Sequence, residues 1–416
     1  MFHIMERRVE PPVSGRGAQG ALVPTRFGLA TREVDGDWRD HVEQLDGPPV
    51  KLRTTVTEEQ PKTILTFNTS PDVPFDRSVN AYRGCEHGCV YCFARPTHAY
   101  HDLSPGLDFE TKLFAKPEAP ALLEKELAAS GYEPRMIAIG TNTDPYQPIE
   151  RRYRIMRQIL EVLHECEHPL TIVTKSALIE RDLDLLAPMA RKRLVRAFIS
   201  VTTLDRSLAR RLEPRAAAPA RRLETIQRLA AAGVPVGVMV APVIPALNDR
   251  DIENILERAR GAGADWAGYV LLRLPYEVKD LFREWLARHE PLRAEHVMSL
   301  VQGARGGRDN DPNFFSRMRG SGPWAELLRT RFEIAARKHG LRQAKFPLRR
   351  DLFQPLLHRG LDQPRSGLLR QHIGVPHRID RHLQPRGLFP QGADRPRGGH
   401  RHPQERQRQE HDQQCG

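Results

Sequence analysis

The chain has 416 residues, 39% of them apolar, and a formal net charge of +12 at pH 7. This length suits one large domain or two ordinary ones. The sequence has no run of about 18 apolar residues and no apolar signal-peptide core near Met1, which argues against a membrane protein and indicates a cytoplasmic one.

Residues 1–61 are polar and lack a sustained period, which predicts a largely disordered extension. From 62 to 290, short β-type runs alternate with helical stretches, and this pattern predicts a core domain with a parallel α/β architecture. The expected strands are Val79–Tyr82, Met136–Gly140, Leu170–Thr174, Ala197–Thr202, Val236–Ala241 and Gly268–Leu272. The expected helices are Ala119–Ala129, Arg151–Glu165, Glu180–Ala190, Pro219–Ala232, Asp249–Gly261 and Glu277–Arg288.

Six strand–helix units in series fit either a doubly wound sheet or a partial barrel. Periodicity does not separate the two, but in both of them ligands bind at the carboxyl ends of the strands. The pattern of residues 291–353 predicts a helical cap. It includes an amphipathic helix near Trp324–His339, followed by a closing strand. Residues 354–416 are a low-complexity tail rich in Arg, His, Gln and Pro, which we expect to be disordered. A tail without a role is favoured, and the functional alternative is a basic nucleic-acid arm or a metal-binding tail.

Three of the five cysteines lie within eight residues, on the loop that follows the first expected strand. The stretch reads Arg-Gly-Cys85-Glu-His-Gly-Cys89-Val-Tyr-Cys92, a C-x3-C-x2-C spacing. Three thiolates on one short loop can hold three corners of a cubane iron–sulfur cluster, which leaves the fourth iron without a protein ligand. Gly84 and Gly88 would allow the loop to wrap closely around such a cluster.

A zinc site is the structural alternative for these cysteines. Structural zinc takes four ligands, usually as two C-x2-C pairs, and here the fourth ligand would be His87 or His98. The spacing of three and then two, and the lack of a second pair, favour a cluster.

The Cys85–Cys92 motif resembles the hallmark of the radical S-adenosylmethionine (SAM) superfamily. Further stretches, GTNTDPYQPIE at 140–150, VTKS at 173–176 and APVIPALND at 241–249, resemble its spore photoproduct lyase-like branch. The resemblance covers 62–353 and implies a partial (β/α)6 TIM-like barrel. It also implies a [4Fe-4S] cluster on Cys85, Cys89 and Cys92, and SAM on the open iron. In this family one electron from the cluster cleaves SAM to a 5′-deoxyadenosyl radical, which abstracts a substrate hydrogen.

The resemblance also implies contacts to SAM at the ends of successive strands. Tyr91 resembles the residue whose backbone meets the adenine, and Lys175 resembles a lysine that meets the SAM carboxylate. Thr141 lies where the family binds the SAM amine, although this chain has Gly-Thr-Asn-Thr in place of Gly-Gly-Glu, so Asn142 and Asp144 are alternates. The remaining two positions are Ser200, which resembles a ribose contact, and Val240, which resembles an apolar adenine wall.

One departure from this branch concerns the substrate. Spore photoproduct lyases use a further cysteine as a hydrogen donor, but Cys166 here lies at the end of a helix expected on the outer ring, and Cys415 lies in the tail. We therefore expect Cys166 to be buried and inert, and do not infer thymine-dimer repair. Tyrosines that could relay hydrogen instead are Tyr146, Tyr269 and Tyr276.

Five arginines follow the fourth strand and fit either a phosphate or carboxylate clamp or a solvated helix surface: Arg210, Arg211, Arg215, Arg221 and Arg222. The leading hypothesis is a radical SAM enzyme with an external one-electron donor such as flavodoxin or ferredoxin. Its substrate stays open, and nucleic acid is compatible with the basic charge. The alternatives are a metal-bearing nucleic-acid-binding protein without SAM chemistry, and a degenerate relative whose cluster is only structural.

Overall fold

A seven-stranded sheet forms the centre of the computed structural model, which describes residues 15–18, 20, 22, 53–343 and 347–356. Its strand order is β10-β9-β8-β7-β6-β3-β2, and all neighbours are parallel except β2 and β3. The strands are β2 (Leu65–Phe67), β3 (Arg77–Val79), β6 (Ile137–Ile139), β7 (Leu170–Thr174), β8 (Val195–Ser200), β9 (Val236–Val243) and β10 (Trp266–Leu271).

The six parallel strands follow one another in space as they do in the chain, from β3 to β10. A doubly wound sheet would reverse its order at a switch point, so this winding is that of an open barrel. The predicted α/β class with a parallel sheet is confirmed, and the strand order selects the partial barrel.

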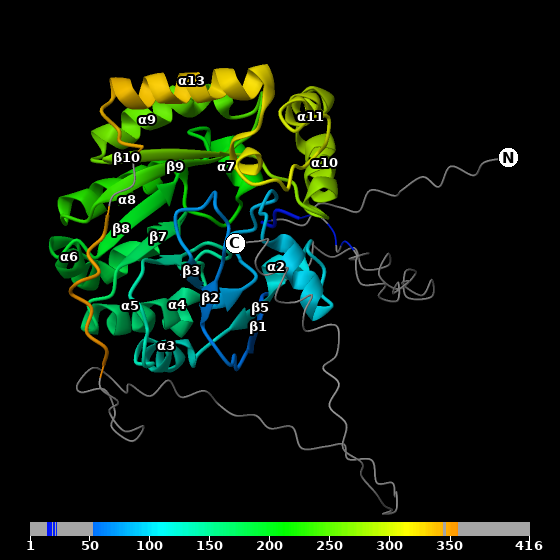
Figure 1. Cartoon of the computed structure of the whole chain (residues 1–416). Helices are drawn as coiled ribbons and strands as arrows, with labels where there is room; N and C mark the ends of the chain where they lie inside the picture. Colours follow the sequence, from blue (N-terminus) through cyan, green and yellow to red (C-terminus); the bar gives the residue numbers. More distant parts are fainter. Residues whose placement is uncertain (1–14, 19, 21, 23–52, 344–346, 357–416) are drawn as a thin grey trace, which may run out of the picture.

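Helices connect the strands and cover the outside of the sheet, where α13 packs on α9 (Figure 1). They are α3 (Ala119–Leu127), α4 (Glu150–Tyr153), α5 (Ile155–Glu165), α6 (Leu183–Arg191), α7 (Arg206–Leu212), α8 (Pro219–Ala231), α9 (Ile252–Gly261), α10 (Val278–His289), α11 (Ala294–Gly303), α12 (Ser316–Arg319) and α13 (Gly322–Lys338). Pro219 opens α8 at a position where the missing N–H costs nothing. Among the described residues, no helix is both long and apolar enough to cross a membrane.

Several expected elements are divided or shifted. The first expected strand is split into β3 and a short β4 (Tyr82–Arg83), and the helix expected at Arg151–Glu165 breaks at Arg154, whose φ is 54°. The helix expected from Glu180 begins as a 3-10 turn over Ala177–Asp182. In place of a closing strand, the described part of 341–353 makes one bridge, between Arg342 and Trp266.

The N-terminal 61 residues contain structure in the parts that are described. Thr55–Glu58 form β1, which pairs in parallel with β5 (Lys112–Ala115), and β4 joins β5 from the other side. Residues 16–18 are buried against the loop that carries the three cysteines. The extension expected at 1–61 is therefore ordered at these two places, because partners from distant parts of the chain supply the missing contacts. Residues 357–416, with Cys415, lie outside the described part.

Candidate functional site

The loop that carries Cys85, Cys89 and Cys92 lies beyond the carboxyl end of β3. Tight backbone hydrogen bonds shape it: Cys85 N–H donates to the Phe109 carbonyl at 2.9 Å, and Cys92 N–H donates to the Cys89 carbonyl at 3.2 Å. Gly84 and Gly88 have φ values of 72° and 66°, a backbone region that disfavours side chains. A Cβ at Gly84 would lie 2.8 Å from the Phe109 carbonyl oxygen, so the loop needs glycine there for space as well.

The three thiols are free, and the charges that they would carry on ionisation interact with one another. Cys85 and Cys89 are 7% and 8% exposed. Burial, together with the neighbouring thiols and acidic groups, raises the pKa of Cys85 well above its ordinary value and that of Cys89 to about 12. Both are therefore protonated in the metal-free chain, and binding a metal has to release these protons.

This donor set fits a cubane cluster. In a cubane each thiolate binds a different iron, so the three sulfur atoms need not converge on one point. Among the described residues, no three His, Cys, Asp or Glu side chains converge closely enough to hold one metal ion. The two histidines that could complete a zinc site make other contacts: His87 Nδ1 lies 3.3 Å from Asp144 Oδ2, and His98 Nε2 lies 2.8 Å from the Lys112 carbonyl oxygen.

A buried ion pair contacts the cysteine loop and stabilises its conformation. Arg95 and Glu110 are both fully buried and paired. Arg95 Nε donates to the Cys89 carbonyl at 2.8 Å, while the Glu110 carboxylate accepts hydrogen bonds from Gly17 N–H at 3.0 Å and Ala18 N–H at 2.8 Å. The N-terminal segment thus contacts the loop directly, and a Cβ on Gly17 would lie 1.6 Å from the Gly88 carbonyl oxygen.

The stretch after β6, residues 140–150, holds the loop from the barrel side. The Gln147 side chain hydrogen-bonds to the residues on both sides of Cys85. Its Nε2 donates to the Gly84 carbonyl at 3.0 Å, and its Oε1 accepts from Glu86 N–H at 3.0 Å. Asp144 accepts hydrogen bonds from Thr174 Oγ1 at 2.6 Å and Lys175 N–H at 2.8 Å. Burial alone would raise the pKa of Asp144, but His87 and these hydrogen bonds outweigh it and lower the pKa to about 2.

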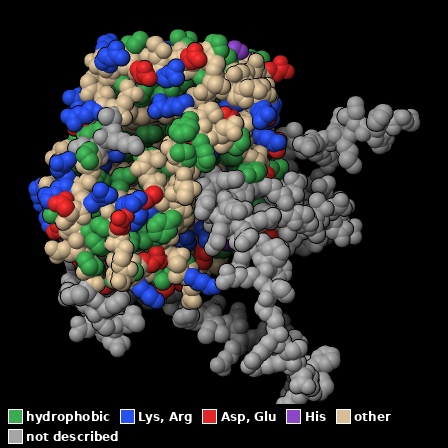
Figure 2. Space-filling model, viewed as in Figure 1, with side chains coloured by type: hydrophobic (Ala, Val, Ile, Leu, Met, Phe, Trp, Pro, Cys, Tyr) green, Lys and Arg blue, Asp and Glu red, His purple; other side chains and the backbone are tan. Residues whose placement is uncertain are grey.

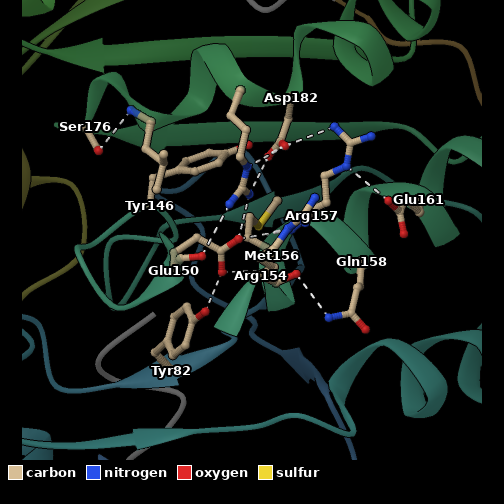
Figure 3. A network of polar contacts seen from close by, with 12 residues as sticks. Tyr82, Tyr146, Glu150, Arg154, Met156, Arg157, Gln158, Glu161, Ser176 and Asp182 are labelled. Atoms are coloured by element: carbon tan, nitrogen blue, oxygen red, sulfur yellow. Dashed lines mark hydrogen bonds and ion pairs between the residues drawn. The ribbon is translucent and has the colours of Figure 1, made fainter. Parts of the chain in front are cut away.

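Glu150 ends this stretch in the polar network of Figure 3. It is buried and accepts hydrogen bonds from the Tyr82 hydroxyl, from Arg181 Nη2 at 2.7 Å and from Met156 N–H at 3.0 Å. Arg181 also pairs with Asp182, and Asp182 contacts Arg157. Because Tyr82 lies three residues before Cys85, this network connects the cysteine loop to the turn after β7.

Lys175 follows β7 and directs its ammonium toward the cysteine loop. The ammonium lies 5.9 Å from the centre of the Tyr91 ring, and it makes no hydrogen bond or ion pair with any described residue. Burial would lower its pKa, but the charges of Cys89 and Glu213 outweigh this and raise it. A half-buried cation that no described residue pairs with is therefore available to an anionic ligand.

Glu213 forms the centre of a second buried network beside Lys175. It pairs with Arg222 and accepts hydrogen bonds from the Tyr91 hydroxyl and, at 2.5 Å, from Thr202 Oγ1. Burial would raise its pKa, but Arg222 and Lys175 lower it to about 2. Arg222 also donates to the carbonyl oxygen of Ser200, at 3.1 Å, so the end of β8 is fixed next to the cysteine loop.

Two of the predicted SAM contacts, Thr141 after β6 and Val240 on β9, have neighbours that are better placed to meet a ligand. Thr141 is partly exposed, whereas the neighbouring Asn142 has a buried Oδ1 without a hydrogen-bond partner among the described residues. Val240 is fully buried and registers with Tyr269, whose ring packs against Phe332 of α13 at 4.7 Å. Val240 thus faces the helices, because successive side chains of a strand alternate between faces. Its main chain, or the neighbours Met239 and Ala241, can face the barrel interior.

The arginines after β8 do not form a free clamp. Four of the five pair with carboxylates of the chain, namely Arg211 with Glu290, Arg215 with Glu86, Arg221 with Glu180 and Arg222 with Glu213. Arg210 is exposed. These arginines therefore hold loops in place.

The remaining predicted residues are also placed. Cys166 is fully buried at the end of α5, where its thiol donates to the Val162 carbonyl at 3.0 Å and burial raises its pKa to about 12. This agrees with the expectation of a buried thiol remote from the cysteine loop. Among the three tyrosines, Tyr146 lines the cavity described next, Tyr269 faces the helices and Tyr276 is 41% exposed.

A cavity of about 460 Å³ opens beside the cysteine loop. Its walls come from this loop and from the segments after β6, β7 and β8, and the residues are His87, Tyr146, Pro148, Arg151, Ser176, Ala177, Leu178, Arg215, Ala216, Ala217 and Arg221. The cavity thus lies at the carboxyl ends of the strands, where the sequence pattern places the ligands.

Sequence reasoning missed several residues of this site. It assigned no role to Glu213, Thr202, Gln147 or Glu110, because each of them acts through a partner that only folding brings close. A signal was available for Glu213 alone, because it lies between Arg210, Arg211 and Arg215 in the sequence and a buried acid is normally paired.

Residues 79–259 match the family model of the Radical SAM superfamily. An uncharacterized protein of Mycobacterium tuberculosis, Rv2578c, is 41% identical over 221 residues, which cover 53% of this chain and 65% of that protein. An uncharacterized protein of Methanocaldococcus jannaschii, MJ0683, is 25% identical over 171 residues, covering 41% of this chain and 61% of that protein. The chain thus spans less than two thirds of the length of these relatives.

Solved structures of spore photoproduct lyase have the same fold. The structure complexed with dinucleoside spore photoproduct has a TM-score of 0.51 at 14% identity and covers 72% of this chain and 86% of that one. A single-residue variant of the lyase has a TM-score of 0.51 at 16% identity, with 70% and 82% covered. Residues 79–259 are therefore similar to the Radical SAM superfamily, and the fold is one that spore photoproduct lyase also has.

Proposed function

We propose that the protein is a radical SAM enzyme that holds a [4Fe-4S] cluster on Cys85, Cys89 and Cys92 and binds SAM at the open iron. One observation carries this proposal. Three buried or half-buried free thiols share one loop at the ligand-binding end of the barrel, and beside them lies a lysine ammonium that has no hydrogen-bond or ion-pair partner in the described part of the chain. When bound, the cluster supplies one electron for the reductive cleavage of SAM.

The residues around the loop would bind and orient SAM. The Lys175 ammonium has the charge to pair with a carboxylate, and the unpartnered Oδ1 of Asn142 can accept a hydrogen bond from an amine. Ser200 and the backbone of Tyr91 stay the proposed contacts for the ribose and the adenine. Thr141 keeps the proposed amine contact together with Asn142, and on β9 we assign the adenine wall to Met239 and Ala241 beside the main chain of Val240.

The proposal is tested by anaerobic reconstitution with iron and sulfide, followed by metal analysis and an assay for 5′-deoxyadenosine. We expect about four irons per chain, 5′-deoxyadenosine in the presence of a strong reductant, and loss of both in Cys85→Ala, Cys89→Ala and Cys92→Ala. Cys166→Ala is the matched control and should keep both. Zinc alone at the site would refute the proposal, and a cluster without 5′-deoxyadenosine would reduce it to the structural-cluster alternative.

Nucleic acid is the substrate class that we propose to test first. Spore photoproduct lyase, with the same fold, has been solved with a dinucleoside photoproduct. Arg151 lies in the wall of the cavity beside the cysteine loop, next to Arg215 and Arg221, which pair with Glu86 and Glu180. On the face that Figure 2 shows, acidic side chains lie among the basic ones, so a local contact is a better expectation than a broad basic surface. Anisotropy with single-stranded DNA and RNA, with peptide pools in parallel, distinguishes the classes, and reduction by flavodoxin or ferredoxin tests the electron donor.

A further inference from the structure

A second cavity, of about 570 Å³, lies at the opposite end of the barrel from the cysteine loop. Residues that precede the strands line it, including Asp76 before β3 and Arg135 and Met136 before β6, together with Arg196 at the start of β8. Arg196 is four residues before Ser200, so at about 3.3 Å per residue the two are about 13 Å apart along the strand. This cavity is thus separate from the proposed SAM site.

Arg196 is buried there, and it has no hydrogen-bond acceptor among the described residues. Its side chain is 7% exposed, its Nε is buried and unpartnered, and it makes no hydrogen bond or ion pair with any described residue. Its contacts are with two aromatic rings, those of Phe198 at 4.8 Å and Trp266 at 5.7 Å. Burial lowers its pKa, and no carboxylate opposes this effect.

Each of the other buried arginines in the described part of the chain has at least one hydrogen-bond acceptor, although the Nε of Arg305 has none. Their acceptors are carboxylates or carbonyls, as follows: Arg16 with the Glu110 carbonyl, Arg77 with Asp76, Arg95 with Glu110, Arg222 with Glu213, Arg305 with the Leu272 carbonyl and Arg317 with Asp72. A buried guanidinium without an acceptor is unfavourable, so the exception at Arg196 calls for an external anion.

A second unpartnered group lies next to Arg196. Thr171 on β7 is its registered neighbour in the sheet, it is 7% exposed, and its Oγ1 is buried without a hydrogen-bond partner among the described residues. Parallel neighbours in register point to the same face of a sheet. A guanidinium and a hydroxyl therefore lie side by side on one face of the sheet, with Arg196 in the wall of the cavity, and both can donate to an oxyanion.

The charges that line the cavity favour the same ligand. They are Arg135, Arg196, Arg350 and one carboxylate, Asp76, which is already engaged by Arg77 and Arg135. We propose that this cavity is a binding site for a small molecule bearing a phosphate or carboxylate group, whose oxygens accept hydrogen bonds from the Arg196 guanidinium and the Thr171 hydroxyl. Its volume suits a small ligand.

The test compares thermal unfolding and calorimetric binding for the full chain, isolated anaerobically, with two probes: inorganic phosphate and citrate. The wild type should bind at least one of them saturably and gain stability as the concentration rises. Saturation by phosphate alone identifies a phosphate site, and saturation by citrate alone identifies a carboxylate site. Arg196→Met should weaken binding by about tenfold or more, because it removes the charged donor. Thr171→Val should weaken it less, and Arg210→Met, an exposed arginine, should leave it unchanged.

A second measurement guards against a variant that merely unfolds. In buffer without either probe, the midpoint of thermal unfolding of Arg196→Met should be at least as high as that of the wild type. The substitution removes a buried charge that no described residue pairs with. A lower unfolding midpoint in this buffer would show that groups of the chain itself pair with Arg196. Equal anion effects on wild type and Arg196→Met, or no saturable binding of either probe, would also overturn the proposal. None of these outcomes depends on SAM chemistry.

Discussion

Glu110→Gln is expected to destabilise the protein strongly, because the Glu110 carboxylate is the counter-ion of Arg95 in a place that water does not reach. Both side chains are 0% exposed, and the carboxylate also accepts the Gly17 and Ala18 N–H groups. Removing one partner of a buried ion pair costs about 3–5 kcal/mol, since the other charge is left buried.

For the pair of Glu110 and Arg95 we expect a cost near the lower end of this range of about 3–5 kcal/mol. The glutamine carbonyl still accepts one hydrogen bond, and Arg95 keeps the carbonyl oxygens of Cys89, Pro105 and Gly106 at 2.8, 3.0 and 2.9 Å. We therefore expect a loss of about 3 kcal/mol in the free energy of unfolding. Because Arg95 also positions the Cys89 carbonyl, the reconstituted variant should lose iron to a chelator faster than the wild type.

Urea unfolding followed by tryptophan fluorescence, under anaerobic conditions, measures the effect. Glu133→Gln is the matched control, since Glu133 is 71% exposed and pairs with a half-exposed Arg135, and it should cost less than about 1 kcal/mol. Adding Arg95→Met to Glu110→Gln should recover part of the loss, because the double variant no longer buries a lone charge. A Glu110→Gln protein within about 1 kcal/mol of the wild type, with an unchanged denaturant slope, would refute this reasoning.

Three further predictions follow from the same structure. Lys175→Met should weaken SAM binding about tenfold or more, measured by calorimetry on the reconstituted protein. Lys279→Met, on the exposed face of α10, should leave SAM binding unchanged. Equal SAM affinities of Lys175→Met and the wild type would refute the assignment of Lys175 as the carboxylate contact. Burial lowers the pKa of His168 from 6.5 to about 4, so the unfolded state binds the extra proton between these values. Stability should thus be full above pH 6.5 and fall by about 3 kcal/mol as the pH drops to 4, and His168→Gln should show a smaller fall; parallel pH curves would contradict this. Gly17→Val should displace the N-terminal segment, because its Cβ would meet the Gly88 carbonyl oxygen, and limited proteolysis should then cleave near residue 17 faster than in the wild type; an unchanged cleavage rate would speak against that contact.

Local pattern was enough for the elements that repeat along the chain. The strand expected at Leu170–Thr174 is found with the same bounds, and the helix from Pro219 ends one residue earlier than expected. Such elements are readable because a buried strand or an amphipathic helix shows its period within a few residues. The cysteine loop was readable for a similar reason, since all three thiols lie within eight residues.

The failures share a different cause. Thr55–Glu58 form a strand only because β5, more than fifty residues later, offers an edge. The break at Arg154 also escaped the pattern, because the apolar period continues on both sides of it. In both cases the deciding contact, or the deciding backbone angle, is absent from the local sequence.

By itself, the sequence determined the α/β class, the order of the core elements and the three thiols on one loop, because short-range periodicity and spacing specify these features. Tertiary structure alone decided the winding as a partial barrel, the face that Val240 presents and the partner of each buried charge. Arg317 and Asp72, for example, are 245 residues apart in the chain and 2.7 Å apart in space. Ion pairs and cavities depend on such distances in space. Only the folded chain therefore shows that Arg196 has no counter-ion among the residues that the structure describes.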